Sequence, residues 1–243
     1  MPKNIGTIKL KGNMGELNFC NNGIVRMRRG SIDKKVLNTK PSLQGIRETN
    51  DEFKGPAKST KLLKDILRNW LRHTKHGDLH NRICSVLNKI KNNDTAVRGS
   101  STISGGLKTP MGRHLLRTFE FTPTHTVLGT LGGKAIYDSE KHIYTVSDFN
   151  VSNVVFPQHA THLEISLALL RIDFENLKRD IVFGPPLFID KNFQETNFTV
   201  AADEPSAEDG TLIALAAARF HIEIEGDKHI VEDFLGIDIL DCC

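Results

Sequence analysis

The sequence has few cysteines, a single tryptophan and no long apolar segment. Its four cysteines are Cys20, Cys84 and the adjacent pair Cys242–Cys243, and none of them forms a C-x-x-C motif. This spacing gives no support to a disulfide framework or a zinc ribbon. No run of about 18 apolar residues is present, which argues against a membrane span. Residues 1–12 lack an apolar stretch of about 7–15 residues, so we expect no secretory signal. The expected location is the cytoplasm, or a particle released from the cell.

Recognisable catalytic signatures are missing as well. Residues 129–134 (GTLGGK) resemble a phosphate-binding loop, but their glycine spacing is one residue short and Ala135 stands where the loop needs Ser or Thr. Four potential metal ligands share a helical spacing: His73, His76, His80 and Cys84. Gly77-Asp78 interrupts that helix, so these side chains are better explained as surface residues beside a turn. We therefore expect no catalytic residues, no cofactor and no metal site.

The composition is that of a globular protein with an uneven charge distribution. The chain has 243 residues, of which 39% are hydrophobic and 25% charged, enough for one or two domains with a core. Residues 1–117 hold 24 of the 32 Lys and Arg but 8 of the 29 Asp and Glu, a net charge of +16. Residues 118–243 hold the other 8 basic and 21 acidic residues, a net charge of −13. The basic half can bind nucleic acid, bind the acidic half of another copy, or be neutralised within its own molecule.

Short strands are predicted at the N-terminal end of the sequence. Alternating apolar residues place them at residues 6–10, 15–20 and 24–28, with turns at Gly12-Asn13 and at residues 21–23. A ribbon of this size is marginally stable in water unless it packs on another surface. Residues 30–57, which are polar and basic, are predicted to be a connector.

Helical periodicity begins after the connector. Leu63, Ile66, Leu67 and Trp70 belong to an apolar stripe with spacings of three and four, and the stripe resumes from Leu79 to Ile90. With a stop at residues 76–78, this pattern predicts an antiparallel helical hairpin in which the tryptophan is packed. The Gly- and Ser-rich residues 99–106 are predicted to be a flexible loop.

The second half of the sequence alternates with a period of two. Strands are predicted at residues 118–122, 162–174 and 220–225, with a hairpin turn at Gly226-Asp227 and a last strand pair at residues 230–240. Ile172 and Phe174 are out of phase with the preceding apolar residues, which predicts a bulge near residues 170–171. The whole pattern predicts an antiparallel β-sandwich whose acidic residues line its solvated faces.

One segment resembles a known family. Residues 47–64 read RETNDEFKGPAKSTKLLK, similar to the segment R-E-N-x-x-E-F-x-x-A-x-K-A-G-K-L-L-R that precedes a helical hairpin in a family of uncharacterised Bacteroidetes proteins. The ribbon and the strand start at residues 160–163 agree with that family, whereas Thr49-Asn50 and Ser59-Thr60 depart from it. The resemblance implies a bacterial source and one continuous architecture. It implies no activity, cofactor or site residue.

Together these patterns predict an α+β chain of three parts. They are a β-ribbon arm with a basic connector (1–57), a helical hairpin with a flexible loop (58–117) and an acidic antiparallel β-sandwich (118–243). The leading hypothesis is a non-enzymatic structural protein that self-assembles head-to-tail, by arm exchange, into a tube, filament or phage-like shell. The alternative is a sequence-independent nucleic-acid-binding protein that uses residues 54–117. The residues predicted to hold the arm on a neighbouring subunit are Ile8, Leu10, Leu17, Phe19, Arg26, Arg28 and Arg29.

Overall fold

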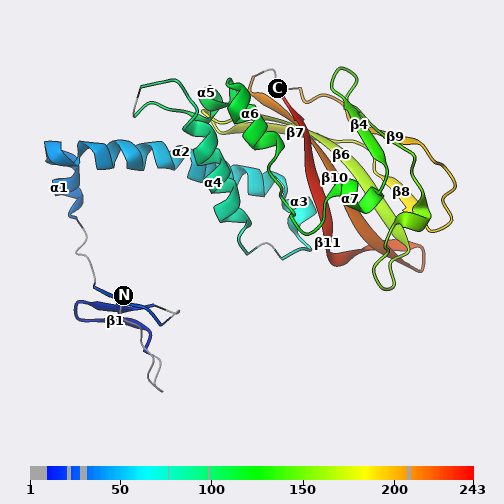
Figure 1. Ribbon diagram of the computed structural model, residues 1–243, viewed down its shortest axis with the longest axis horizontal. Helices are drawn as coiled ribbons and strands as arrows, with labels where there is room; N and C mark the ends of the chain where they lie inside the picture. The colour runs from blue at the N-terminus through cyan, green and yellow to red at the C-terminus, as the bar shows by residue number, and fades with distance from the viewer. Residues whose placement is uncertain (1–9, 21–22, 28–31, 76, 98, 207–208) are drawn as a thin grey trace. The chain divides into compact units, whose positions relative to one another are not determined.

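The computed structural model describes residues 10–20, 23–27, 32–75, 77–97, 99–206 and 209–243. The chain divides into two compact units, Met1–Arg47 and Glu48–Cys243, whereas the sequence predicted boundaries after residues 57 and 117. A small N-terminal antiparallel sheet is followed by helices and then by antiparallel sheets, as Figure 1 shows, so the predicted α+β class is confirmed.

The N-terminal unit contains a three-stranded antiparallel sheet in the order β1-β2-β3, which we call the arm sheet. The elements of the unit are β1 (Gly12–Met14), β2 (Leu17–Phe19), β3 (Val25–Met27), α1 (Lys34–Thr39), the 3-10 turn η1 (Pro41–Leu43) and the start of α2 (Gln44–Ile66). The predicted turn at Gly12-Asn13 is wrong, because these residues pair with Phe19 and Asn18 in the sheet. The reversal occurs at Gly15, whose φ of +55° favours glycine.

The second unit contains helices and two sheets. Its remaining helices are α3 (Arg68–Leu71), α4 (Leu79–Lys91), α5 (Ile103–Leu107), α6 (Pro110–Arg117), α7 (Val127–Leu131) and the 3-10 turn η2 (Val151–Asn153). Its strands are β4 (Lys134–Asp138), β5 (Ile143–Ser147), β6 (His162–Asp173), β7 (Lys178–Phe183), β8 (Leu187–Asp190), β9 (Phe198–Ala201), β10 (Thr211–Ile224) and β11 (Asp227–Cys242). One sheet has the order β11-β10-β6-β7 with β8 also paired to β6, and the other has the order β4-β5-β9.

The predicted helices at residues 58–91 form, but the first one starts earlier. Their apolar stripe is buried, with Leu67 and Leu87 0% exposed, and Trp70 of α3 packs edge-to-face on Phe183 of β7 at 5.3 Å between ring centroids. The predicted connector contains α1 and the first half of α2. That half has no buried described residue, so the apolar periodicity from which helices are predicted is absent there.

The predicted flexible loop at residues 99–106 is partly helical. Thr102 caps α5 by accepting a hydrogen bond from the Gly105 N–H at 2.9 Å, and Ile103 is 4% exposed. A Cβ on Gly106 would lie 2.0 Å from the carbonyl oxygen of Ile90, so glycine is needed there for α5 to approach α4. The glycines that predicted flexibility therefore allow close packing.

The long sheet is covered on both of its faces. Leu167 and Leu169 of β6 point into one core, with β5, β9 and α7, whereas Ala168 and Leu170 point into the other, with the helices α2 to α6. Figure 1 shows α4 to α6 beside one part of this sheet and β4 and β9 beside another. The predicted bulge near residues 170–171 is wrong, since β6 stays in register with β10 there. Apolar residues occur at both odd and even positions of β6 because both faces of this strand are buried.

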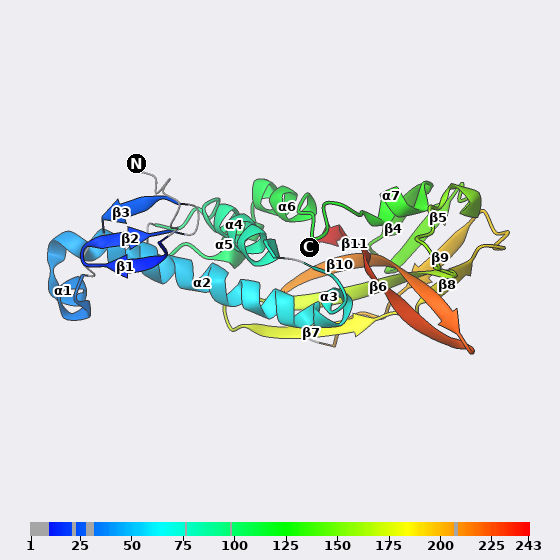
Figure 2. The ribbon, with the colours of Figure 1, turned by 90° about the horizontal axis from the view of Figure 1, so that it is seen from below.

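Other parts of the β-rich half differ in detail from the prediction. Residues 118–122 are not a strand, although Phe121 is buried as a core residue. β10 and β11 form the predicted hairpin, in which Ile224 pairs with Asp227, but β11 is one long strand rather than two. Figure 2 shows β6, β10 and β11 running through this unit as long strands.

Candidate functional site

The arm sheet has one apolar and one polar face. Residues directly opposite each other on paired strands place their side chains on the same face. The registers therefore put two cross-strand rows on one side, Met14–Leu17–Met27 and Gly12–Phe19–Val25. The row Asn13–Asn18–Arg26 lies on the other side, where Asn18 donates a hydrogen bond to the Asn13 side chain at 2.6 Å. We call Met14, Leu17, Phe19, Val25 and Met27 the arm face.

Within the N-terminal unit, no described residue covers the arm face. Met14 is 61% exposed, Leu17 40% and Met27 72%, and no described residue from 10 to 55 is buried. Large apolar side chains clustered on one face of a small sheet make this face a candidate interaction surface, because an isolated sheet of this size is marginally stable in water.

The residues predicted to anchor the arm fall in different places. Leu17 and Phe19 lie on the arm face, Leu10 is 43% exposed just before β1, and Arg26 lies on the polar face. Ile8, Arg28 and Arg29 lie outside the described residues. Sequence reasoning missed three members of the arm face: Met14, Val25 and Met27. The alternation of residues 24–28 contained the signal for the last two, whereas Met14 was hidden by the misplaced turn.

A buried polar cluster links β6 and β10. Register places Glu164 opposite Arg219, and one carboxylate oxygen (Oε2) of Glu164 accepts hydrogen bonds from Arg219 Nε at 2.8 Å and from His221 Nε2 at 2.6 Å. Glu164 is 3% exposed and His221 4%, and Phe188 packs edge-on against the histidine ring. The prediction that acidic residues line solvated faces is therefore wrong for Glu164.

The pKa of Glu164 shows that the contacts of the cluster outweigh the cost of burying its charged carboxylate. Burial by itself would raise this pKa, but the hydrogen bonds and charges of His221 and Arg219 outweigh it, and the pKa lies below its ordinary value. The carboxylate is thus ionised at neutral pH, paired with Arg219 and hydrogen-bonded to His221. These contacts explain Glu164 as a structural group.

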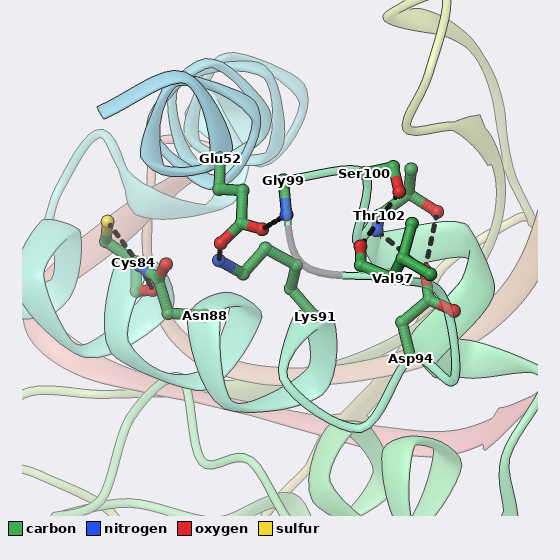
Figure 3. Close-up of polar contacts among 9 residues, drawn as sticks. All are labelled: Glu52, Cys84, Asn88, Lys91, Asp94, Val97, Gly99, Ser100 and Thr102. Atoms are coloured by element: carbon green, nitrogen blue, oxygen red, sulfur yellow. Dashed lines mark hydrogen bonds and ion pairs between the residues drawn. The ribbon is translucent and has the colours of Figure 1, made fainter. Parts of the chain in front are cut away.

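A second buried ion pair fastens the helices to one another. Figure 3 shows Glu52 of α2 reaching Lys91 at the end of α4. The Lys91 Nζ lies 3.0 Å from one carboxylate oxygen of Glu52, and the other oxygen accepts the Gly99 N–H at 2.6 Å. The Lys91 side chain is 8% exposed and that of Glu52 16%. In the same loop, Asp94 accepts the Thr102 N–H at 2.7 Å, and this bond is the largest cause of the lowered pKa of Asp94. The contacts join α2, α4 and the loop before α5.

The described histidines, carboxylates and thiols do not form a metal-binding or reactive cluster. No group of three or more His, Cys, Asp or Glu residues that could hold a metal ion occurs among the described residues. His73 and His80 are described, and His76 is not. The four cysteines are free thiols, and burial is the main cause of the raised pKa of Cys242 and Cys243, which lowers their reactivity. Within the described ranges, no helix is long and apolar enough to cross a bilayer.

A hollow of about 530 Å³ lies where the two sheets of the second unit meet, and we call it the seam groove. Its apolar lining comes from β4, β11, α7 and the segment after α6: Phe119, Leu128, Ala135, Tyr137, Ile239 and Leu240. Two carboxylates, Glu120 and Asp238, also line it, together with Arg117, which is paired with Asp241. Asp238 accepts hydrogen bonds from the N–H groups of Val127 and Leu128 at 2.9 and 3.3 Å, which fixes α7 against β11.

Comparisons with known proteins add no family to this description. No protein-family model, no curated protein and no solved structure matches the chain. The resemblance of residues 47–64 to the Bacteroidetes family stays a prediction.

Proposed function

We propose that the protein is a non-enzymatic structural protein that self-assembles through its N-terminal arm. The observation that carries this proposal is the arm face, with Met14 61% and Met27 72% exposed on one side of a sheet that has no buried residue. Burying apolar surface contributes about 25 cal/mol per Å², so covering this face stabilises both the arm sheet and the contact. The two internal ion clusters, around Glu164 and Glu52, are explained by packing, which supports a structural role.

Charge favours a second copy of the chain as the partner that covers the arm. Residues 1–47 have ten Lys and Arg against two Asp and Glu, and Lys11 and Arg26 of the arm are exposed. Residues 118–243 have 21 acidic against 8 basic residues. A basic arm on an acidic body is a contact between different surfaces, and such head-to-tail contacts produce rings or shells when they close and filaments or tubes when they do not.

The size of the assemblies is expected to depend on salt. The Debye length falls from about 8 Å at 0.15 M salt to about 3 Å at 1 M, so attraction between arm and body weakens. Light scattering over this range should show large species that become smaller as salt rises. A monodisperse monomer at every salt concentration would contradict the proposed function.

A second candidate function rests on the exposed face of α2. Lys54, Lys58 and Lys61 are exposed and spaced by four and three residues, which aligns them along one side of the helix. Such a row can bind phosphates without reading sequence.

If this function operates, the intact protein retains random-sequence duplex DNA at about 0.1 M salt, and retention falls steeply as salt rises. Gel-shift titration measures this binding. The double substitution Lys58→Gln and Lys61→Gln should weaken it. DNA that stays free throughout the titration of the intact protein would exclude the nucleic-acid-binding function.

A further inference from the structure

The seam groove borders a strand, β4, that has no partner on one side among the described strands. In the sheet order β4-β5-β9, β4 is an edge strand, and its residues Ala135 and Tyr137 line the groove. Ile136 between them points to the opposite face and is 71% exposed. On α7, Leu128 is 49% exposed at the groove. An edge strand beside an apolar hollow is a template for the addition of another strand, whose inward side chains would cover the hollow.

The arm sheet has the features that such an addition requires. Both β1 and β3 are edge strands of the arm sheet. Each has three residues, and either strand can pair with part of the five-residue strand β4. Its apolar residues are all on one face and its polar residues on the other. If the arm sheet continued the β4-β5-β9 sheet, Met14, Leu17 and Met27 would lie over the groove, and Asn13 and Arg26 would remain in solvent.

The charge around the groove fits a basic arm. Glu120 and Asp238 line it, and Asp138 ends β4. Burial raises the pKa of Tyr137 to about 12, and the nearby carboxylates of Asp241, Asp138 and Glu204 add to the effect. The groove therefore lies in a negative potential, which attracts a segment of net positive charge. The cation within the lining, Arg117, is already paired with Asp241.

We propose that the β4 edge and the seam groove of one copy receive the arm sheet of a second copy, edge to edge, with the arm face over the groove. This inference rests on the proposed self-assembly and names its acceptor surface. The partner is a second copy of this chain, because the arm sheet carries both a charge complementary to the groove and apolar side chains on one face only.

Crosslinking between two differently tagged copies tests the acceptor. Both copies carry Cys20→Ser and Cys243→Ser, which leaves Cys84 (8% exposed) and Cys242 (1%) as the remaining thiols. One copy adds Met14→Cys and the other Leu128→Cys, and the two are co-expressed and treated with a short bismaleimide. The matched control replaces Leu128→Cys with Val155→Cys, an apolar position of the same unit that is 87% exposed and outside the groove lining.

The Met14–Leu128 pair is expected to give at least about tenfold more covalent heterodimer than the Met14–Val155 pair, because binding holds the two thiols at a high effective concentration. Equal yields, or no heterodimer with Leu128→Cys in a protein that still assembles, would overturn the acceptor and leave the proposed function in place. If a single copy that carries both Met14→Cys and Leu128→Cys crosslinks only within itself, the arm folds back on its own chain, and both proposals are overturned. An intact protein that stays monomeric overturns the proposed function itself.

Discussion

Replacing Met14 with aspartate is expected to abolish assembly. The side chain lies on the arm face at the edge strand β1, opposite Leu17, and a carboxylate there must be buried without a partner when the face is covered. Burying an unpaired charge costs about 3 kcal/mol or more, which corresponds to a loss of affinity of about 100-fold. Analytical ultracentrifugation should show monomers at concentrations where the parent chain forms large species.

The matched control is Asn13→Asp. It adds the same charge one residue away, on the polar face of the same strand, and should leave assembly nearly unchanged. Met14→Asp should keep the cooperative melting of the parent protein, since Met14 is 61% exposed and both buried cores lie in the second unit. Deletion of residues 1–31 should likewise give a folded monomer. A large drop in melting temperature in both variants would mean that the arm completes the core of its own chain.

Replacing Glu164 with glutamine is expected to destabilise the β-rich unit strongly. The substitution keeps the shape but removes the negative charge that Arg219 pairs with at 2.8 Å and that accepts the hydrogen bond of His221 at 2.6 Å. Loss of one member of a buried ion pair costs about 3–5 kcal/mol of unfolding free energy. Urea denaturation measures this cost.

Glu223→Gln is the control for that change. Glu223 is 3.5 Å from His162, and its side chain is 40% exposed, so its loss should cost less than about 1 kcal/mol. Equal effects of the two substitutions would show that the Glu164 cluster adds no stability beyond that of a surface pair.

The stabilisation from Glu164 also has a defined pH dependence. Its pKa is lower in the folded protein than in the unfolded chain, where a glutamate has a pKa of about 4.3. The folded state therefore binds the proton less tightly, and the stabilisation is present above about pH 4.3 and lost as pH falls through the folded-state pKa. The difference in unfolding free energy between the parent chain and Glu164→Gln should shrink below about pH 4; a difference that grows on acidification would contradict this assignment.

The fold class could be predicted from the sequence because local periodicity survives in the folded chain. The stripe from Leu63 to Trp70 and the alternation of residues 162–169 each correspond to an element with a buried face. Gly226 likewise marks the hairpin between β10 and β11, with a φ of +92° that favours glycine. The first half of α2 and the helix α5 were missed, because the former has no buried face and the latter contains two glycines.

Of the candidate sites, the sequence indicated the arm only in part. Leu17 and Phe19 were identified from alternation, but the single arm face became visible only when the strand register aligned them with Met14 and Met27. The Glu164 cluster could not be predicted. Its members lie 55 and 57 residues apart in the chain and meet because β6 pairs with β10 in one particular register.

The sequence by itself determined the mixed α+β class, the small N-terminal sheet, the buried helical stripe and the opposite charges of the two halves. These depend on composition and on neighbours a few residues apart. Only the tertiary structure decided that helices cover the second face of the long sheet, that Glu164 is buried, and that β4 and β11 border a groove. Such features depend on which distant segments pack together, because burial and pairing are set by the whole fold and not by local spacing.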